Sequence, residues 1–145
     1  MCLTLYLFTD NQVDEIDFDE LNPAFWVQKI TEGLLIDVQQ ARNWVPEKSN
    51  IYYMGSNLGC GCGWFPINDE HDEDEVVTAA RDRKNLMQLL GSKEFNGSHL
   101  IACWEGGEGE PLKRREAIRL PDIANLQFEF EECVDYVLWG LEDQV

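Results

Sequence analysis

One stretch, residues 50–65, constrains the fold of this chain more than any other. It reads Asn-Ile-Tyr-Tyr-Met-Gly-Ser-Asn-Leu-Gly-Cys-Gly-Cys-Gly-Trp-Phe, an apolar and aromatic run followed by a loop rich in glycine and cysteine. Glycine adopts backbone conformations that other residues resist, at a cost of roughly 0.5–1 kcal/mol in regular structure. We therefore expect a backbone path that either turns tightly or is approached closely by another group. The residues expected to set that path are Gly55, Ser56, Gly59, Gly61 and Gly63.

The two cysteines of this loop, Cys60 and Cys62, alternate with glycines. Side chains of an extended segment repeat every two residues on one face, so an extended loop would place both thiols side by side. If neighbouring strands bring in Cys2 and Cys103, three or four sulfur atoms meet. Such a group is typical of a structural zinc site, with Zn–S distances of ~2.3 Å. Familiar zinc ribbons place two residues between paired cysteines, whereas this pair has one.

Other interpretations of the same loop remain open. His71 and His99 are alternative fourth ligands for a metal. Free cysteine is among the most buried residue types, so the thiols can also be small side chains that only pack. A reactive thiol needs a cation or a helix N-terminus to lower its pKa, and the nearby sequence offers carboxylates instead. A phosphate cradle over residues 55–59 would lack the Gly-Lys-Ser/Thr ending of a P-loop.

The charge of the chain limits its partners. Of 145 residues, 28 are acidic and 11 basic, giving a formal net charge of -17. Phosphates are bound by lysine and arginine, so we exclude nucleic acid as a direct ligand. A strongly acidic protein can instead steer a basic protein toward itself. The candidate partner-binding residues are Asp69, Glu70, Asp72, Glu73 and Asp74.

Length, apolar content and cysteine usage indicate the domain organisation and the compartment of the chain. We interpret residues 1–145 as a single domain, because this length is typical of one domain. No run approaches the ~20 apolar residues of a membrane span. The apolar start lacks a basic region and a cleavage site, so we interpret it as a strand buried on both faces, not as a signal peptide. Five cysteines without an export signal indicate reduced thiols and a cytoplasmic protein.

Apolar spacing predicts a strand-rich domain of the α+β class. The order of elements favours a mainly antiparallel sheet with one main helix, about 75–91, packed on one face. The spacing also indicates a helix over residues 34–44. Strands are expected over residues 2–8, 25–30, 51–54, 100–104, 118–120, 126–131 and 134–139.

The main helix is the clearest element of the pattern. Its apolar face is expected to hold Val76, Val77, Ala80, Met87 and Leu90. The acidic run before it, residues 68–75, complements the positive end of the helix dipole by ~0.3–1 kcal/mol per charge. The run has no glycine at a bend, so we reject a calcium loop.

Residues 52–64, Tyr-Tyr-Met-Gly-Ser-Asn-Leu-Gly-Cys-Gly-Cys-Gly-Trp, resemble the motif of a family of uncharacterised small bacterial proteins. Members of that family typically read Tyr-Tyr-x-Gly-Ser-x-x-Gly-Cys-Gly-Cys-Gly-aromatic. Residues 1–3, 22–25 and 103–106 are similar to the family as well, so the resemblance covers most of the chain. It implies a bacterial, intracellular setting, and it brings no established activity with it.

Two functions from different classes follow. The first is a non-enzymatic acidic domain that binds a basic protein, as small immunity proteins neutralise basic nuclease toxins; this is an analogy of class only. The second is a small zinc-binding or thiol-active protein that uses Cys60, Cys62, Cys103 and Cys2. No cofactor is predicted, although the cysteines would allow a zinc ion to bind. No catalytic residue is assigned.

Overall fold

The computed structural model describes residues 2–31 and 36–141. Within them lies one six-stranded sheet of strand order β2-β3-β1-β4-β6-β5. Neighbouring strands are antiparallel, except that β5 and β6 run parallel. The elements, with η for a short 3-10 helix, are β1 (Leu3–Thr9), β2 (Trp26–Lys29), α1 (Ile36–Arg42), β3 (Asn50–Gly55), η1 (Gly61–Trp64), α2 (Glu73–Leu90), η2 (Lys93–Phe95), β4 (His99–Trp104), β5 (Arg114–Ile118), α3 (Leu120–Ala124) and β6 (Val134–Leu138).

Strand β1 lies inside the sheet, between β3 and β4, and is buried along its whole length. An apolar run without alternation is typical of a strand covered on both faces. Leu5 and Leu7 contribute to one hydrophobic core, whereas Tyr6 and Phe8 contribute to another on the opposite face. The prediction of a first strand buried on both faces is therefore confirmed.

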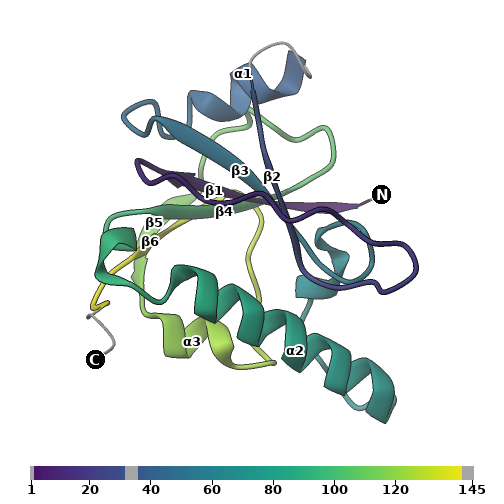
Figure 1. The fold of residues 1–145 in the computed structure, drawn as a ribbon. Coiled ribbons are helices and arrows are strands. Elements are labelled where there is room, and N and C mark those ends of the chain that lie inside the picture. The colour runs from purple at the N-terminus through teal and green to yellow at the C-terminus, as the bar shows by residue number, and fades with distance from the viewer. Residues whose placement is uncertain (1, 32–35, 142–145) are drawn as a thin grey trace.

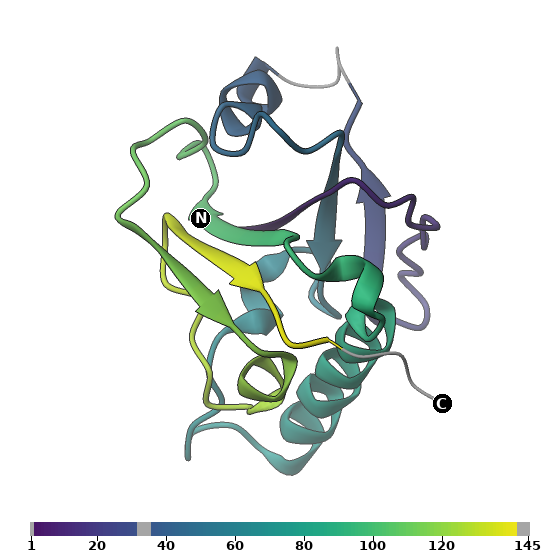
Figure 2. The same cartoon turned by 90° about the vertical axis from the view of Figure 1, so that its left-hand side faces the viewer.

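Helices cover both faces of the sheet (Figure 1). On one face lie α2 and α3, next to each other in the view of Figure 2, and their Leu86 and Ile123 belong to the larger core. On the other face lies α1, whose Ala41 belongs to the second core. The predicted α+β class and the main helix on one face are confirmed. Of the helix predicted over 34–44, residues 36–42 are helical, and 34–35 lie outside the described residues.

The buried face of α2 differs from the predicted one. Val77 and Ala80 are exposed to solvent. Of the predicted residues, Leu90 is buried and Met87 packs in part against the larger core. The rest of the stripe was misplaced because two members of the true buried face are charged. The buried residues of α2 are Ala79, Asp82, Arg83, Leu86 and Leu90.

Two strand predictions in the last third of the chain are wrong. Residues 126–131 form no strand, although they alternate apolar and polar. Their Phe128 and Phe130 rings instead contact the ring of Tyr136 edge-on, so that Phe130 is buried and Phe128 partly buried without strand pairing. Residues 118–120 span the end of β5 and the start of α3, where Pro121 lies in the first turn of the helix.

The acidic run before α2 caps this helix. Asp72 is the N-cap, and its Oδ1 accepts a hydrogen bond from the Glu75 backbone N–H at 2.8 Å. The Glu75 carboxylate accepts in return from the Asp72 N–H at 3.4 Å. This reciprocal capping box satisfies two backbone donors that a helix start leaves open. Among the described helices, none has the length and apolar character that crossing a membrane requires.

Candidate metal centre

Three thiols meet at the start of β1. Cys2 comes directly before this strand, Cys60 and Cys62 come from the glycine-rich loop, and the three sulfur atoms all lie within 4.8 Å of one another. Tetrahedral zinc with sulfur ligands at 2.3 Å would space those sulfurs about 3.8 Å apart. Each of the three residues is partly exposed and each is a free thiol. This group, called the thiol triad below, can therefore hold a metal ion.

The two loop thiols converge through a helical turn. Residues Gly61–Trp64 form η1, with Cys60 as its N-cap. The Sγ atom of Cys60 accepts a hydrogen bond from the Cys62 backbone N–H at 3.4 Å. The segment is therefore helical and not extended, which was the condition under which the alternating spacing was expected to align the two thiols. The two sulfur atoms nevertheless lie close together, because the Cys60 side chain folds over the first turn of η1 as its N-cap.

Gly61 allows η1 to lie directly against β1. A Cβ atom built on Gly61 would lie 2.5 Å from the backbone oxygen of Leu3 and 3.4 Å from the backbone nitrogen of Leu5. Real Cβ atoms do not approach a backbone oxygen so closely, so only glycine fits here. Because Leu3 follows Cys2 in the chain, this contact brings the loop thiols to the third thiol.

A buried serine closes the loop on itself. Ser56 is fully buried, and its hydroxyl donates to the backbone oxygen of Cys60 at 2.6 Å. The same hydroxyl oxygen accepts from the Gly63 N–H at 3.0 Å, and a Cβ on Gly63 would overlap it. The Ser56 N–H also donates to the Cys60 oxygen, at 2.9 Å. The backbone on both sides of the two thiols is therefore fixed.

Two charged residues of α2 hold the ends of the loop. The Asp82 carboxylate, fully buried, accepts from the Asn57 N–H at 2.8 Å, from the Asn57 side-chain amide at 2.7 Å and from the Phe25 N–H at 3.0 Å. The Arg83 guanidinium, also buried, donates to the Trp64 oxygen at 2.7 Å. The sequence interpretation missed both residues. The signal that could have found them is a charged pair set among the buried positions of an amphipathic helix.

Without a metal, the Cys60 thiol keeps its proton at neutral pH. Burial raises the pKa of the Cys60 thiol to about 12, and the neighbouring thiols of Cys62 and Cys2 add to this shift. Burial, followed by the nearby Cys60, likewise raises the pKa of the Tyr53 hydroxyl to about 12. Cys60 is therefore not a reactive thiolate. A metal cation would favour the deprotonated form, because ligating thiols bind as thiolates.

We expect the metal-free protein to lose stability as the pH rises above about 9. Folding raises the pKa of Cys60 from 9.0 to about 12, so the folded state binds this proton more tightly than the unfolded state does. That contribution is complete below pH 9 and is lost as the pH rises toward 12. Urea denaturation in chelator between pH 7 and 11 measures the decline. In the Cys60→Ser variant the decline should be shallower, and equal slopes in the two proteins would contradict this prediction.

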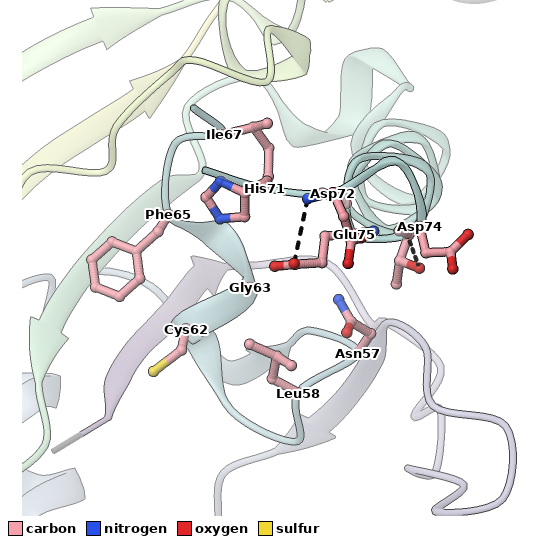
Figure 3. Close-up of a pocket in the computed structure, with 12 residues that line it drawn as sticks. Asn57, Leu58, Cys62, Gly63, Phe65, Ile67, His71, Asp72, Asp74 and Glu75 are labelled. Carbon is pink, nitrogen blue, oxygen red and sulfur yellow. Dashed lines mark hydrogen bonds between the residues drawn. The ribbon is translucent and has the colours of Figure 1, made fainter. Parts of the chain in front are cut away.

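The other predicted ligands lie outside the triad. Cys103 is buried in the second core, and its thiol lies near Glu108 and Cys133. His99 Nδ1 lies 2.7 Å from Asp135 Oδ1, in a buried pair. His71 bonds to Asn68 outside the triad, and Figure 3 shows the Cys62 sulfur pointing away from the His71 ring. The structure thus brings together three of the four predicted cysteines, and neither histidine joins them.

The candidate partner-binding carboxylates are exposed at the start of α2. Asp69 and Glu70 precede the helix, whereas Glu73 and Asp74 lie in its first turn. Asp72 is exposed as well, although its carboxylate also caps the helix. The structure thus places these residues together on one surface.

No family model matches this chain, and neither does a curated protein or a solved structure. The resemblance of residues 52–64 to a bacterial family therefore stays a prediction.

Proposed function

We propose that this protein binds a zinc ion through Cys2, Cys60 and Cys62. The observation that carries the proposal is the convergence of three sulfur atoms within 4.8 Å of one another. Thiolate sulfur is a preferred ligand of zinc. Three protein ligands leave the fourth tetrahedral position for water or a further ligand. The bound ion would tie the start of the chain to the glycine-rich loop.

The exposure of the triad supports metal binding over simple packing. Cysteines that only pack are expected to be buried, as Cys103 and Cys133 are. Cys2, Cys60 and Cys62 are partly exposed, so an ion can reach their sulfur atoms. Reduced thiols of this kind suit the cytoplasm, and we include a cytoplasmic, bacterial setting in the proposal.

The surroundings of the triad also suit a metal. The Cys62 N–H already donates to the Cys60 sulfur at 3.4 Å, as outer-shell donors do toward ligating atoms. The bonds made by Ser56 and Asp82 fix the loop before any metal arrives. A preformed site binds more tightly because less chain entropy is lost when the ion enters.

Metal analysis of the full chain tests this proposal. Protein purified without chelator should carry about one tightly bound zinc per chain. The Cys60→Ser/Cys62→Ser variant should lose it and bind added zinc at least 100-fold more weakly, whereas Cys103→Ala, as the matched control, should keep it. Circular dichroism checks that each variant is folded. Equal zinc affinity in wild type and the double variant would overturn the proposal.

We propose as a second function that a basic protein segment docks at the start of α2. A cavity of about 250 Å³ lies there, with apolar side chains on one side and carboxylates on the other (Figure 3). The side chains of lysine and arginine combine an apolar stem with a charged head, which matches this lining. The residues that carry the match are Leu58, Phe65, Ile67, Asp72, Asp74 and Glu75.

Charge-reversal variants test the docking surface. A fluorescent lysine-rich peptide should bind the wild type at low salt and weaken at high salt. The Asp74→Lys/Glu75→Lys variant, which reverses two carboxylates of the cavity lining, should bind it at least 10-fold more weakly. Glu47→Lys/Glu129→Lys changes the net charge equally at exposed positions outside the cavity. An equal loss in both variants would mean that only the overall charge matters, which contradicts a site.

A further inference from the structure

The cysteines of this chain fall into two groups that differ in access and in chemistry. Cys103 and Cys133 are buried in the second core, whereas Cys2, Cys60 and Cys62 are partly exposed. Burial raises the pKa of the Cys103 and Cys133 thiols, and nearby carboxylates add to the rise. A buried, protonated thiol resists oxidants, because the thiolate is the form that reacts. Oxidation of this chain is therefore expected at the thiol triad.

Cys60 is the central thiol of the triad. Its side chain makes hydrogen bonds with the thiols of both Cys2 and Cys62. All three sulfur atoms lie within 4.8 Å of one another. Because a disulfide requires its two sulfur atoms to approach to about 2 Å, the triad needs only a small side-chain movement to form one.

The backbone around the triad favours Cys2 over Cys62 as the disulfide partner of Cys60. Cys60 and Cys62 belong to one turn, η1 with its N-cap, and the Ser56 hydroxyl bonds to the backbone of Cys60 and of Gly63 on either side of that turn. These bonds fix the two loop thiols relative to each other. Cys2 lies before β1, outside the regular strand, so its side chain can approach Cys60 without moving η1.

We propose that peroxide oxidises the thiol triad to a disulfide between Cys2 and Cys60 and thereby releases the zinc ion. This inference rests on the proposed zinc site and adds a redox switch to it. One zinc-bound thiolate attacks hydrogen peroxide, which transfers an oxygen to the sulfur and loses hydroxide. The second thiolate attacks that sulfur, forming the S–S bond and expelling the transferred oxygen as a second hydroxide. Two electrons pass from the two sulfur atoms to peroxide, and the ion loses two of its three sulfur ligands.

The zinc-bound triad would meet the requirements of this reaction. Cysteines ligate zinc as thiolates, and peroxide oxidises thiolates. Because Cys2, Cys60 and Cys62 are partly exposed, a molecule as small as peroxide can reach their sulfur atoms. Redox-sensing cysteines combine thiolate character, exposure and a second thiol close by. The disulfide would tie Cys2 to η1 as the ion does, so the oxidised chain should keep its fold.

Peroxide treatment of the full chain loaded with zinc tests this switch. Metal analysis first measures the zinc that the reduced protein binds. Excess hydrogen peroxide should then release this zinc to a chromogenic chelator. Mass spectrometry of unreduced peptides should find Cys2 linked to Cys60, with Cys103 and Cys133 still present as thiols. Dithiothreitol should restore zinc binding.

Two variants identify the thiols that react. Cys2→Ser removes the proposed partner, so peroxide should leave a sulfenic acid on Cys60 that dimedone traps. Cys103→Ala, as the matched control, should form the disulfide and release zinc at the rate of the wild type. Circular dichroism checks that each variant is folded. A Cys60–Cys62 disulfide that forms in Cys2→Ser as fast as the wild-type disulfide would overturn the choice of Cys2.

The outcomes separate the redox switch from the zinc site. Zinc that reduced protein binds and retains in excess peroxide overturns the switch and leaves the proposed function intact. Release of zinc without a disulfide, or with a disulfide only between Cys60 and Cys62, also overturns the switch alone. Reduced protein that binds no zinc overturns the proposed function, and the switch with it.

Discussion

Replacing Asp82 with alanine is expected to lower the free energy of unfolding by about 3–5 kcal/mol. The Asp82 carboxylate is fully buried and accepts hydrogen bonds from Phe25 and from two groups of Asn57. Each donor left buried without a partner costs ~1–3 kcal/mol. Urea denaturation measures the change. Zinc affinity should also fall by roughly 10–100-fold, a range typical of lost outer-shell support.

The matched control for Asp82 is an exposed carboxylate on the same helix. Glu73 lies in the first turn of α2 and is exposed. Glu73→Ala should cost no more than about 1 kcal/mol, through its weaker interaction with the helix dipole. If Asp82→Ala lowered the free energy of unfolding as little as Glu73→Ala does, the contacts made by α2 would not be what holds the loop in place.

Replacing Gly61 with alanine is expected to separate the loop thiols from Cys2. The new Cβ atom would lie 2.5 Å from the backbone oxygen of Leu3, which belongs to a buried strand and cannot move aside easily. We expect a loss of about 1–3 kcal/mol in the free energy of unfolding, as for other overpacked sites. The zinc affinity should fall at least 100-fold, because η1 must move away from β1. Isothermal titration with zinc measures this fall.

The Gly106→Ala variant separates the effect of backbone strain from the effect of a steric clash. Gly106 has a φ of 87°, and a Cβ atom there would meet nothing within 4 Å. This variant should cost about 1–2 kcal/mol through the left-handed backbone alone, and zinc binding should not change. Equal zinc affinity in Gly61→Ala and wild type would show that the close approach of η1 to β1 does not build the site.

The sequence was enough to predict that Cys60 and Cys62 lie together, because their spacing forces proximity in either an extended strand or a tight turn. It was not enough to choose between Cys2 and Cys103 as partners. That choice depends on strand register, since Thr4 lies opposite Cys103 and Leu3 opposite Trp104. Cys2 therefore lies past the last of these pairs, where its oxygen accepts from the Glu105 N–H at 2.8 Å. No local pattern specifies that register.

The sheet and the main helix could be predicted from apolar spacing. The contacts that hold the glycine-rich loop in place could not. Asp82 and Arg83 are buried only because Asn57, Phe25 and Trp64 supply partners from distant parts of the chain. A pattern of apolar residues treats both as solvent-facing. The strand prediction for residues 126–131 failed for a related reason. Ring contacts with Tyr136, and not strand pairing, cover their aromatic side chains.

X-ray absorption spectroscopy at the zinc edge tests most directly whether the glycine-rich loop builds a metal centre. Wild-type protein with one equivalent of zinc should show a first shell dominated by three sulfur atoms at ~2.3 Å. In Cys60→Ser/Cys62→Ser that sulfur shell should disappear. A wild-type first shell made only of nitrogen and oxygen would contradict zinc binding by the triad of Cys2, Cys60 and Cys62.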